Sequence, residues 1–396
     1  MSKPRPLAGL KVLEMGALIA GPFCAKVLAE FGAEVIKLEP PGTGDPLRKW
    51  RYVKDGTSVW WHVQSRGKKS VALDLRKPEG QAIARKLALA ADIVVENFRP
   101  GTMERLGLGY EALAPYNPRL IYCSEKGFLS GPYEQRTALD EVAQMMGGLA
   151  YMTGPPGRPL RAGSSVIDVT GGMFGVIGIL AALEERHRTG RGQKVASSLF
   201  ETTVYLVGQH MAQQAVTGQA AKPMPVRISA WAIYDVFETQ DSEQVFVGIV
   251  SDSLWEKFCA AFGLRELGAD PQYKTNSQRV LAREALLPQV RAVFKAYAKD
   301  DLIARLERTG LPFAPIGKPE ELFDDPHLLA SGGLGDVTLA DGRKTRLPLL
   351  PIELDGARPT QGGTLPAVGQ HTRDVLASIG VDDAEIDRLS AGGVIQ

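Results

Sequence analysis

The first third of the chain alternates short apolar runs with longer stretches of helical periodicity, and this alternation restricts the possible folds most strongly. Short apolar runs bounded by turn residues predict buried strands, and the amphipathic stretches between them predict helices. Helices between successive strands imply a parallel sheet with right-handed crossovers. We therefore expect an α/β fold, with a Rossmann-like domain and a mainly parallel sheet. The predicted strands are 11–15, 34–38, 70–74, 93–95 and 120–124, and the predicted helices are 23–31 and 78–90.

The pattern changes after residue 203, which predicts a second, smaller α+β domain. Residues 209–224 are polar and suggest a flexible segment. Beyond them, short apolar runs predict strands and amphipathic stretches predict helices. We expect a large domain of residues 1–225 and 319–396 and a small domain of residues 226–318. The predicted strands of the small domain are 230–237, 244–250 and 312–316, its helices are 253–262, 282–297 and 300–308, and a late helix at 370–379 belongs to the large domain.

Composition excludes several classes of partner. Lys plus Arg (46) nearly balance Asp plus Glu (45), so nucleic acid and anionic membranes are not expected as partners. The longest apolar run, 173–183, is short and rich in glycine, and we expect a soluble protein without a membrane span. The three cysteines show no paired spacing and lie in apolar contexts, which predicts reduced thiols and a cytoplasmic protein. The five histidines are scattered, so no metal site is predicted.

Several common catalytic motifs are missing from the sequence. The turn at 16–22 lacks the G-x-G-x-x-G spacing of a dinucleotide site. No Walker loop and no G-x-S-x-G elbow occur either. The sequence therefore gives little support to a nicotinamide enzyme, an NTPase or a serine hydrolase.

Residues 157–202 contain one carboxylate, Asp168, between a small-residue turn and an apolar stretch that ends at Gly190. This pattern predicts a loop that delivers Asp168 to the start of a buried helix at about 171–188. A carboxylate in that place can be a helix cap or a chemical reagent. The residues alone leave both interpretations open.

Five segments together resemble class III CoA-transferases, the family that includes formyl-CoA transferase. They are 16–45, 66–80, 94–107, 117–133 and 157–202, in the order of the family. The resemblance implies a large α/β domain with a small domain, and two chains interlinked as a homodimer. It also implies transfer of coenzyme A from an acyl-CoA to a free carboxylic acid, with the thioester as substrate and no resident cofactor.

The resemblance gives Asp168 a covalent role. An ionised aspartate attacks the thioester to form a mixed anhydride, and the released CoA thiolate then forms an aspartyl-CoA thioester. The incoming acid repeats these steps in reverse. Backbone N–H groups of the glycine turn after Asp168 are expected to stabilise the oxyanions.

The same resemblance implies a set of coenzyme A contacts and a second acid. Asp140 is either a second active-site acid or an ordinary first-turn helix acid. Two departures are visible, because Pro40 replaces an arginine of formyl-CoA transferase and residues 203–250 contain no glycine-rich flap. The implied CoA-binding residues are Ile19, Ala20, Leu73, Arg76, Asn97, Phe98, Arg105 and Lys126.

Two other activities belong to the same resemblance. Racemases of the superfamily have a histidine immediately before the second acid, whereas this chain has Leu139, which cannot exchange protons. A non-catalytic acyl-CoA-binding protein would lack the nucleophile, which is present here. The α-methylacyl-CoA racemase activity is therefore the alternative to CoA transfer.

Residues 126–163 resemble the branch that acts on C4–C5 dicarboxylic acids. This predicts succinyl-CoA or another dicarboxyl-CoA as donor and mesaconate, itaconate or citramalate as acceptor, or an intramolecular C1–C4 transfer in mesaconyl-CoA. A dicarboxylate needs a cation for its distal carboxylate. The sequence does not choose among Arg48, Arg51, Arg136, Arg161 and Arg227.

Overall fold

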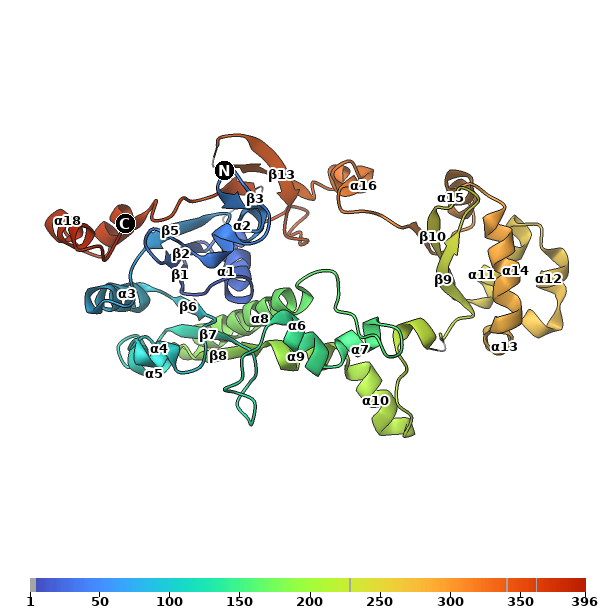
Figure 1. Cartoon of the computed structure of the whole chain (residues 1–396), viewed down its shortest axis with the longest axis horizontal. Helices are drawn as coiled ribbons and strands as arrows, with labels where there is room; N and C mark the ends of the chain where they lie inside the picture. Colours follow the sequence, from blue (N-terminus) through green and yellow to red (C-terminus); the bar gives the residue numbers. More distant parts are fainter. Residues whose placement is uncertain (1–4, 228, 340, 361) are drawn as a thin grey trace. The chain divides into compact units, whose positions relative to one another are not determined.

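The computed structural model describes residues 5–227, 229–339, 341–360 and 362–396. The chain forms two compact units (Figure 1). The larger contains Met1–Pro225 and Pro326–Gln396, and the smaller contains Val226–Asp325. We expected the return to the larger unit after residue 318, whereas the chain first passes through the short helix η4 (Glu321–Phe323).

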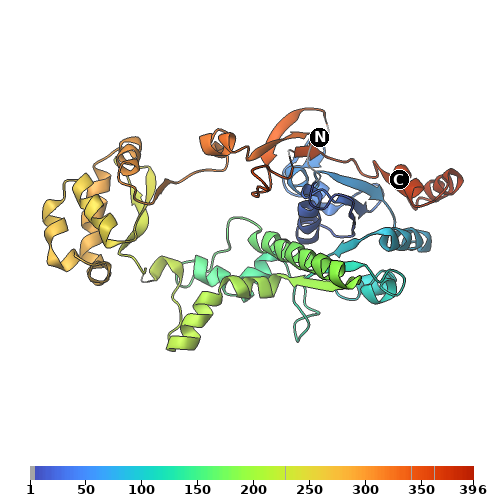
Figure 2. The same ribbon diagram turned by 180° about the vertical axis from the view of Figure 1, so that it is seen from behind.

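A six-stranded sheet organises the larger unit, with all neighbouring strands parallel, which confirms the predicted α/β class (Figures 1 and 2). Its order is β5-β2-β1-β6-β7-β8. The chain builds outward from β1 on one side and then from β6 on the other, so the carboxyl ends of β1 and β6 form the switch point where such sheets bind ligands. The strands are β1 (Lys11–Glu14), β2 (Glu34–Glu39), β5 (Lys68–Ala72), β6 (Ile93–Glu96), β7 (Ile121–Lys126) and β8 (Lys194–Ser198).

In the six-stranded sheet, two strands depart most from the sequence-based expectation. β5 begins at Lys68, two positions before the predicted start. The apolar pattern excluded its two lysines, but in the structure Lys68 is buried and Lys69 pairs with Glu34. β8 was not predicted at all. Its sequence, KVASS, contains a single large apolar residue, and the strand forms through its pairing with β7 at the edge of the sheet.

Helices cover both faces of this sheet (Figure 2). On one face α1 (Ala20–Glu30) packs along α8 (Val166–Thr189), and both contribute to a core with the apolar residues of β1, β6 and β7. The other face is covered by α3 (Pro78–Ala90), α17 (Thr372–Ser378) and α18 (Asp383–Ala391). Residues after α18 then run beside the end of β5, where the Asp74 N–H donates to the Val394 carbonyl at 2.8 Å.

The helix α8 is longer than the apolar run that defined it in the sequence. By length and composition it meets the requirements of a membrane span, as many core helices also do, and 44% of its most apolar window is buried. Since it packs against α1, β7 and β8, we interpret it as a core helix.

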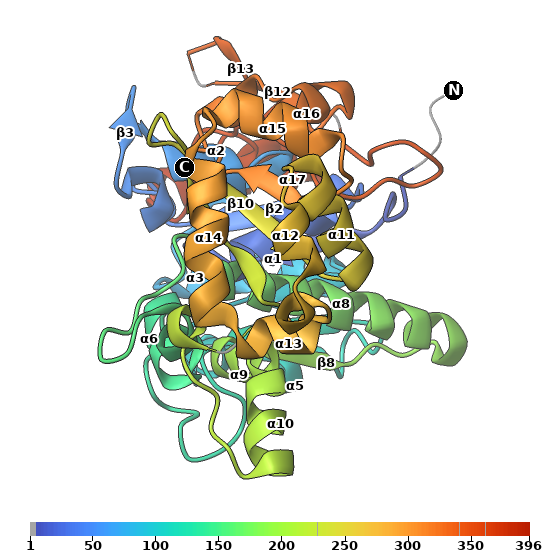
Figure 3. The ribbon, with the colours of Figure 1, turned by 90° about the vertical axis from the view of Figure 1, so that its right-hand side faces the viewer.

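The smaller unit is an antiparallel three-stranded sheet with helices packed on it (Figure 3). Its strands are β9 (Ile233–Glu238), β10 (Gln244–Ile249) and β11 (Phe313–Pro315). The main helices are α11 (Asp252–Ala261), α14 (Arg283–Lys295) and α15 (Lys299–Glu307). Trp255, Phe258 and Phe294 form the centre of its core.

The expected flexible segment at 209–224 contains a helix instead, α10 (Gly208–Thr217). The prediction was wrong because the polar composition of this segment is that of a helix that buries none of its described residues against its own chain. An isolated helix of this length is marginal in water. This helix therefore needs support from elsewhere.

A buried network of opposite charges ties three strands to the loop that follows β1. The Lys37 Nζ of β2 lies 2.7 Å from Glu14 Oε1 and 2.7 Å from Asp45 Oδ2, and it donates to the Gly16 carbonyl. The Lys68 Nζ of β5 lies 2.7 Å from Glu14 Oε2 and donates to the Pro22 carbonyl. All four ionic side chains are almost completely buried.

These ion pairs offset the desolvation of the two lysine ammonium groups. Burial alone would lower the pKa of Lys37, but Asp45 and Glu14 raise it above its ordinary value. Burial lowers the pKa of Lys68 to about 8, although Glu14 opposes the shift. Glu14 thus shares its charge between two ammonium groups.

We expect Lys37→Met to destabilise the protein by about 3–5 kcal/mol, because it leaves the Glu14 and Asp45 carboxylates with too little buried positive charge. Urea unfolding of the full chain measures this loss. The matched control is Lys69→Met, whose partner Glu34 is exposed, and it should cost less than about 1 kcal/mol. Equal losses for the two variants would contradict this account of the network.

Candidate active site

A cavity of about 280 Å³ opens at the carboxyl ends of β1, β6 and β7. Its wall contains Asp168 together with the loops that follow β1 and β6. It therefore lies at the switch point of the sheet. Among the residues that the resemblance implied as coenzyme A contacts, this cavity brings together Ile19, Ala20, Asn97, Phe98 and Lys126.

Asp168 lies inside the first turn of α8, because that helix begins at Val166 and not at about residue 171. The N-cap residue is Ser165, whose side chain makes no capping hydrogen bond. The cap comes from another helix, α6 (Asp140–Met146). Asp140 Oδ2 accepts hydrogen bonds from the Ile167 N–H at 2.7 Å and the Asp168 N–H at 3.1 Å.

Asp140 thus holds the helix start that carries Asp168. It is buried, and its second oxygen accepts a hydrogen bond from the Gln144 side chain. The Gln144 side-chain oxygen in turn accepts from the Ala162 N–H at 2.9 Å. Asp140 is not among the residues lining the cavity. Its position accordingly fits a residue that orients the 162–168 segment.

Burial and charge both act on the Asp168 carboxyl. Burial and, to a smaller extent, the negative charge of Asp140 raise its pKa to about 7, while the positive charge of Arg161 acts in the opposite direction. Asp168 is therefore balanced between its neutral and ionised forms near neutral pH, which is the range of a side chain that must react as a carboxylate.

The loop after β1 is fixed by the end of β6. The Asn97 side chain accepts from the Ala17 N–H at 2.8 Å and donates to the Ala17 carbonyl at 2.9 Å. A Cβ at Gly16 would lie 2.8 Å from Asn97 Oδ1, so glycine permits this close approach. Leu18 adopts a positive φ of 65°, and its N–H donates to Asp45 Oδ1.

The expected oxyanion donors after Asp168 are not available. Gly171 and Gly172 lie within α8, where their N–H groups belong to the helix. Their small size has another use, since a Cβ at Gly172 would lie 2.8 Å from the Ala20 carbonyl oxygen of α1. Gly172 therefore allows α1 and α8 to approach closely.

The other implied coenzyme A contacts lie outside the cavity. Leu73 is buried in the core, and Arg76 is exposed and pairs with Asp74 at 2.8 Å. Arg105 is exposed and donates to the Thr102 hydroxyl. Leu73 and Arg76 follow β5, so they lie at the same carboxyl edge of the sheet, two strands away from β1. Their contact with coenzyme A stays a prediction.

Among the residues of the cavity wall that sequence analysis missed is a buried carboxyl, Glu125. It follows Ile121 and Cys123 on one face of β7, a position that the alternation of the strand assigns to the core. Burial raises its pKa to about 8. Its Oε1 occupies the space that a Cβ at Gly175 would fill, and its Oε2 has no hydrogen-bond partner among the described residues.

Cys24, Cys123 and Glu125 form the one cluster of potential metal ligands found among the described residues, with ligand atoms within 4.8 Å of one another. All three are buried, and each has a raised pKa. In their neutral forms they are two thiols and a carboxylic acid. This pattern was invisible in the sequence because the residues come from α1 and β7.

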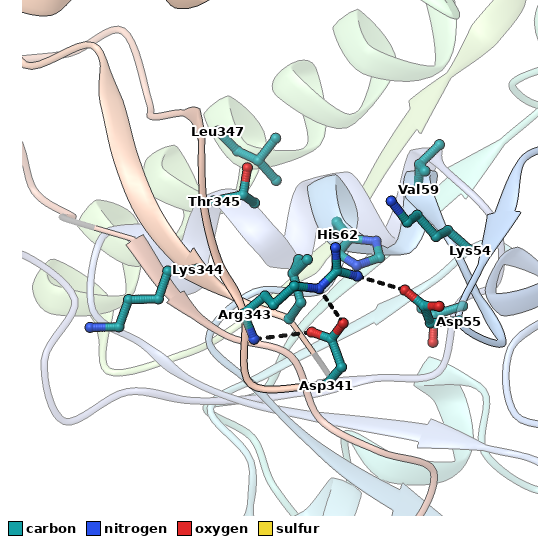
Figure 4. Close-up of a pocket in the computed structure, with 11 residues that line it drawn as sticks. Lys54, Asp55, Val59, His62, Asp341, Arg343, Lys344, Thr345 and Leu347 are labelled. Atoms are coloured by element: carbon teal, nitrogen blue, oxygen red, sulfur yellow. Dashed lines mark hydrogen bonds and ion pairs between the residues drawn. The ribbon is translucent and has the colours of Figure 1, made fainter.

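A second cavity, of about 350 Å³, lies between the short hairpin of β3 (Val53–Lys54) and β4 (Thr57–Ser58) and that of β12 (Leu334–Thr338) and β13 (Lys344–Pro348) (Figure 4). Arg343 projects toward Asp55 and Asp341 and pairs with both. The lining residues include none of the predicted catalytic or CoA-binding positions.

Comparisons with known proteins agree with the resemblance. The sequence model of CoA-transferase family III matches residues 7–372. A succinyl-CoA–D-citramalate CoA-transferase of Chloroflexus aurantiacus is 36% identical, over 99% of this chain and 98% of its own. A succinyl-CoA:glutarate CoA-transferase of Mus musculus is 32% identical, over 99% of this chain and 91% of its own.

Solved structures give the same result for the fold. A CAIB/BAIF family protein from Brucella suis has a TM-score of 0.84 and 33% identity, over 95% of this chain and all of the other. The matches extend through both units and include the cavity with Asp168. The chain therefore belongs to CoA-transferase family III and is a CoA-transferase.

Proposed function

We propose that this protein transfers coenzyme A between C4–C5 dicarboxylic acids by covalent catalysis on Asp168. The carrying observation is the position of Asp168 in the wall of the cavity at the sheet's switch point, beside Ile19, Ala20 and Asn97. The relatives named for citramalate and glutarate support the substrate class. The acyl-CoA and the free acid are substrates, and the proposal requires no resident cofactor.

The proposed reaction balances without an added reagent. The Asp168 carboxylate attacks the thioester carbonyl, the C–S bond breaks, and an acyl-aspartyl anhydride and CoA thiolate form. The thiolate then attacks the aspartyl carbonyl, releasing the first acid and leaving an aspartyl-CoA thioester. The second acid reverses both steps and leaves as a new acyl-CoA.

The start of α1 supports stabilisation of the oxyanions. Ile19, its N-cap, provides no side-chain cap, and the first N–H groups of a helix have no partner within it. Ile19 and Ala20 both line the cavity. We propose these N–H groups as the oxyanion donors, in place of the glycines after Asp168.

The relatives favour succinyl-CoA as donor. Citramalate, mesaconate, itaconate and glutarate are the acceptors to compare, and mesaconyl-CoA tests intramolecular transfer. A racemase would need a proton-exchanging partner for Asp168. The cavity presents Leu139 at that place, which favours CoA transfer.

We also propose the interlinked homodimer that the resemblance implies. Met173, Ile177 and Leu180 of α8 are exposed apolar residues at helical spacing. Tyr205, which is 74% exposed, continues this surface because it packs edge-on against Phe174. A second chain covering this surface would also support α10.

We expect Asp168→Ala to lower CoA exchange at least about 10³-fold, because it removes the carboxylate that carries both proposed intermediates. After incubation with succinyl-CoA, mass spectrometry of the wild type should find CoA on the peptide containing Asp168. The control is Asp300→Ala, which removes an exposed first-turn acid of α15 and should leave exchange unchanged. Substantial exchange by Asp168→Ala would refute the nucleophile assignment.

The rate should fall as the pH drops below about 7, because the raised pKa leaves Asp168 neutral and unreactive there. Asp140→Asn removes the neighbouring negative charge but keeps an oxygen for the helix cap. We expect this variant to shift the midpoint of the pH dependence of kcat/KM down by roughly one pH unit. Burial of Asp168 should still keep this midpoint above the ordinary pKa of an aspartate. Unchanged pH profiles in a folded variant would exclude the charge of Asp140 as a cause.

Light scattering after gel filtration should give twice the mass of one chain. Ile177→Asp combined with Met211→Asp should reduce the dimer or the yield of folded protein, because it places charges in the proposed interface. Leu281→Asp is the control, since Leu281 is exposed in the smaller unit. A monomeric wild type would contradict the dimer.

A further inference from the structure

A dicarboxylic acyl group brings a second negative charge to a site that already contains Asp168. Its distal carboxylate must exchange water for a cation, and arginine provides the matching pair of parallel donors. The sequence offered five arginines for this role. Their surroundings in the structure separate them.

Three of these arginines are committed elsewhere in the larger unit. Arg48 is buried and binds both oxygens of Glu39, at 2.8 and 2.7 Å. Arg161 pairs with Glu141. Arg51 lies over the rings of Trp50 and Trp60, which do not line the cavity.

The remaining two differ in their relation to Asp168. Arg227 belongs to the smaller unit and is not among the residues that line the cavity. Arg136 lines the same cavity as Asp168. Within the described part of the chain, no carboxylate is recorded in an ion pair with Arg136, so its charge is available.

An aromatic cluster holds the Arg136 guanidinium in place. Its central carbon lies 4.2 Å from the centre of the Tyr133 ring. Tyr133 packs edge-on against Phe128, at 5.7 Å, and Phe200, at 6.4 Å. The backbone N–H of Arg136 also donates to the Tyr133 carbonyl at 2.8 Å, which closes the turn between these residues. Stacking on Tyr133 orients the guanidinium of Arg136 and leaves its N–H groups facing away from the ring. The side chain therefore loses little further entropy when it binds a carboxylate.

The other cations of the cavity are less suited to this role. Lys126 pairs with Glu96 at 2.7 Å. Arg99 directly follows Asn97 and Phe98, the implied coenzyme A contacts. Arg136 instead comes from the segment that leads into Leu139 and the Asp140 cap of the nucleophile's helix.

We propose that Arg136 binds the distal carboxylate of the dicarboxylic acyl group and so determines the preference for dicarboxylic over monocarboxylic acids. The proposal rests on the proposed CoA transfer through Asp168. The fork of the guanidinium would pair with both carboxylate oxygens, and the Tyr133 ring would support it from one face.

Isotope exchange with one acid at a time tests this role. Labelled succinate is exchanged into succinyl-CoA, and labelled butyrate into butyryl-CoA, so only the distal carboxylate differs. We expect Arg136→Met to lower kcat/KM for the succinyl pair by 10²–10³-fold and to change that for the butyryl pair less than threefold. Arg136→Lys should recover part of the preference, and Tyr133→Leu should weaken it less than Arg136→Met.

Arg99→Met is the matched control, because it removes a second exposed cation of the cavity. It should affect both acyl pairs equally. Equal losses of both activities in Arg136→Met, or a lost preference in Arg99→Met alone, would overturn the assignment to Arg136. Absence of any exchange by the wild type would instead refute the proposed CoA transfer on which the assignment rests.

Discussion

The buried pairing of Lys37 with Glu14 and Asp45 is the interaction on which the site depends. Lys37 neutralises Glu14 at the end of β1 and Asp45 in the segment after β2, and the Leu18 N–H, in a residue with a left-handed backbone, donates to Asp45. Without this compensation, two buried carboxylates next to the loop after β1 would lack an opposite charge, which is strongly destabilising. The carboxyl edge of the sheet can then present Ile19 and Ala20 to the cavity, and Asn97 fixes the loop from β6.

The helix α8 illustrates how a reactive carboxylate is kept reactive. The Asp140 carboxylate, and not Asp168 itself, accepts the first N–H groups of the helix. Asp168 therefore has no capping duty, and its own charge is disfavoured by burial and by the neighbouring acid. Both effects raise the energy of the ionised ground state, which makes the carboxylate a better nucleophile when it forms.

Much of the fold follows from local patterns in the sequence. The helix at 78–90 was predicted with its observed bounds, because Pro78 starts it and its apolar residues recur at helical spacing. Strands with apolar residues were predicted in the same way, whereas β8 depends on pairing with β7 and lacks such a pattern. The segment containing α10 was misjudged because it is polar, and the helix that it forms has no buried residue among those described.

The site was less accessible to local patterns. The sequence places Asp168 at the start of a helix, where a capping residue and a nucleophile have the same pattern. Only the resemblance to a family indicates the nucleophile. The true cap, Asp140, is remote in sequence, and no spacing rule connects the two. Glu125 and the free guanidinium of Arg136 become apparent only when strands and loops are brought together.

The contact between the end of β5 and the last residues of the sequence has a consequence for the order of folding. The residues that complete its end, at positions 394–396, are separated from it by the whole smaller unit and the rest of the chain. The sheet can assemble early from local crossovers, but its outer edge must wait for a contact of very long range, which is slow to form. Until then the edge strand β5 exposes unpaired backbone groups to other nascent chains, which makes it a site of possible aggregation during synthesis.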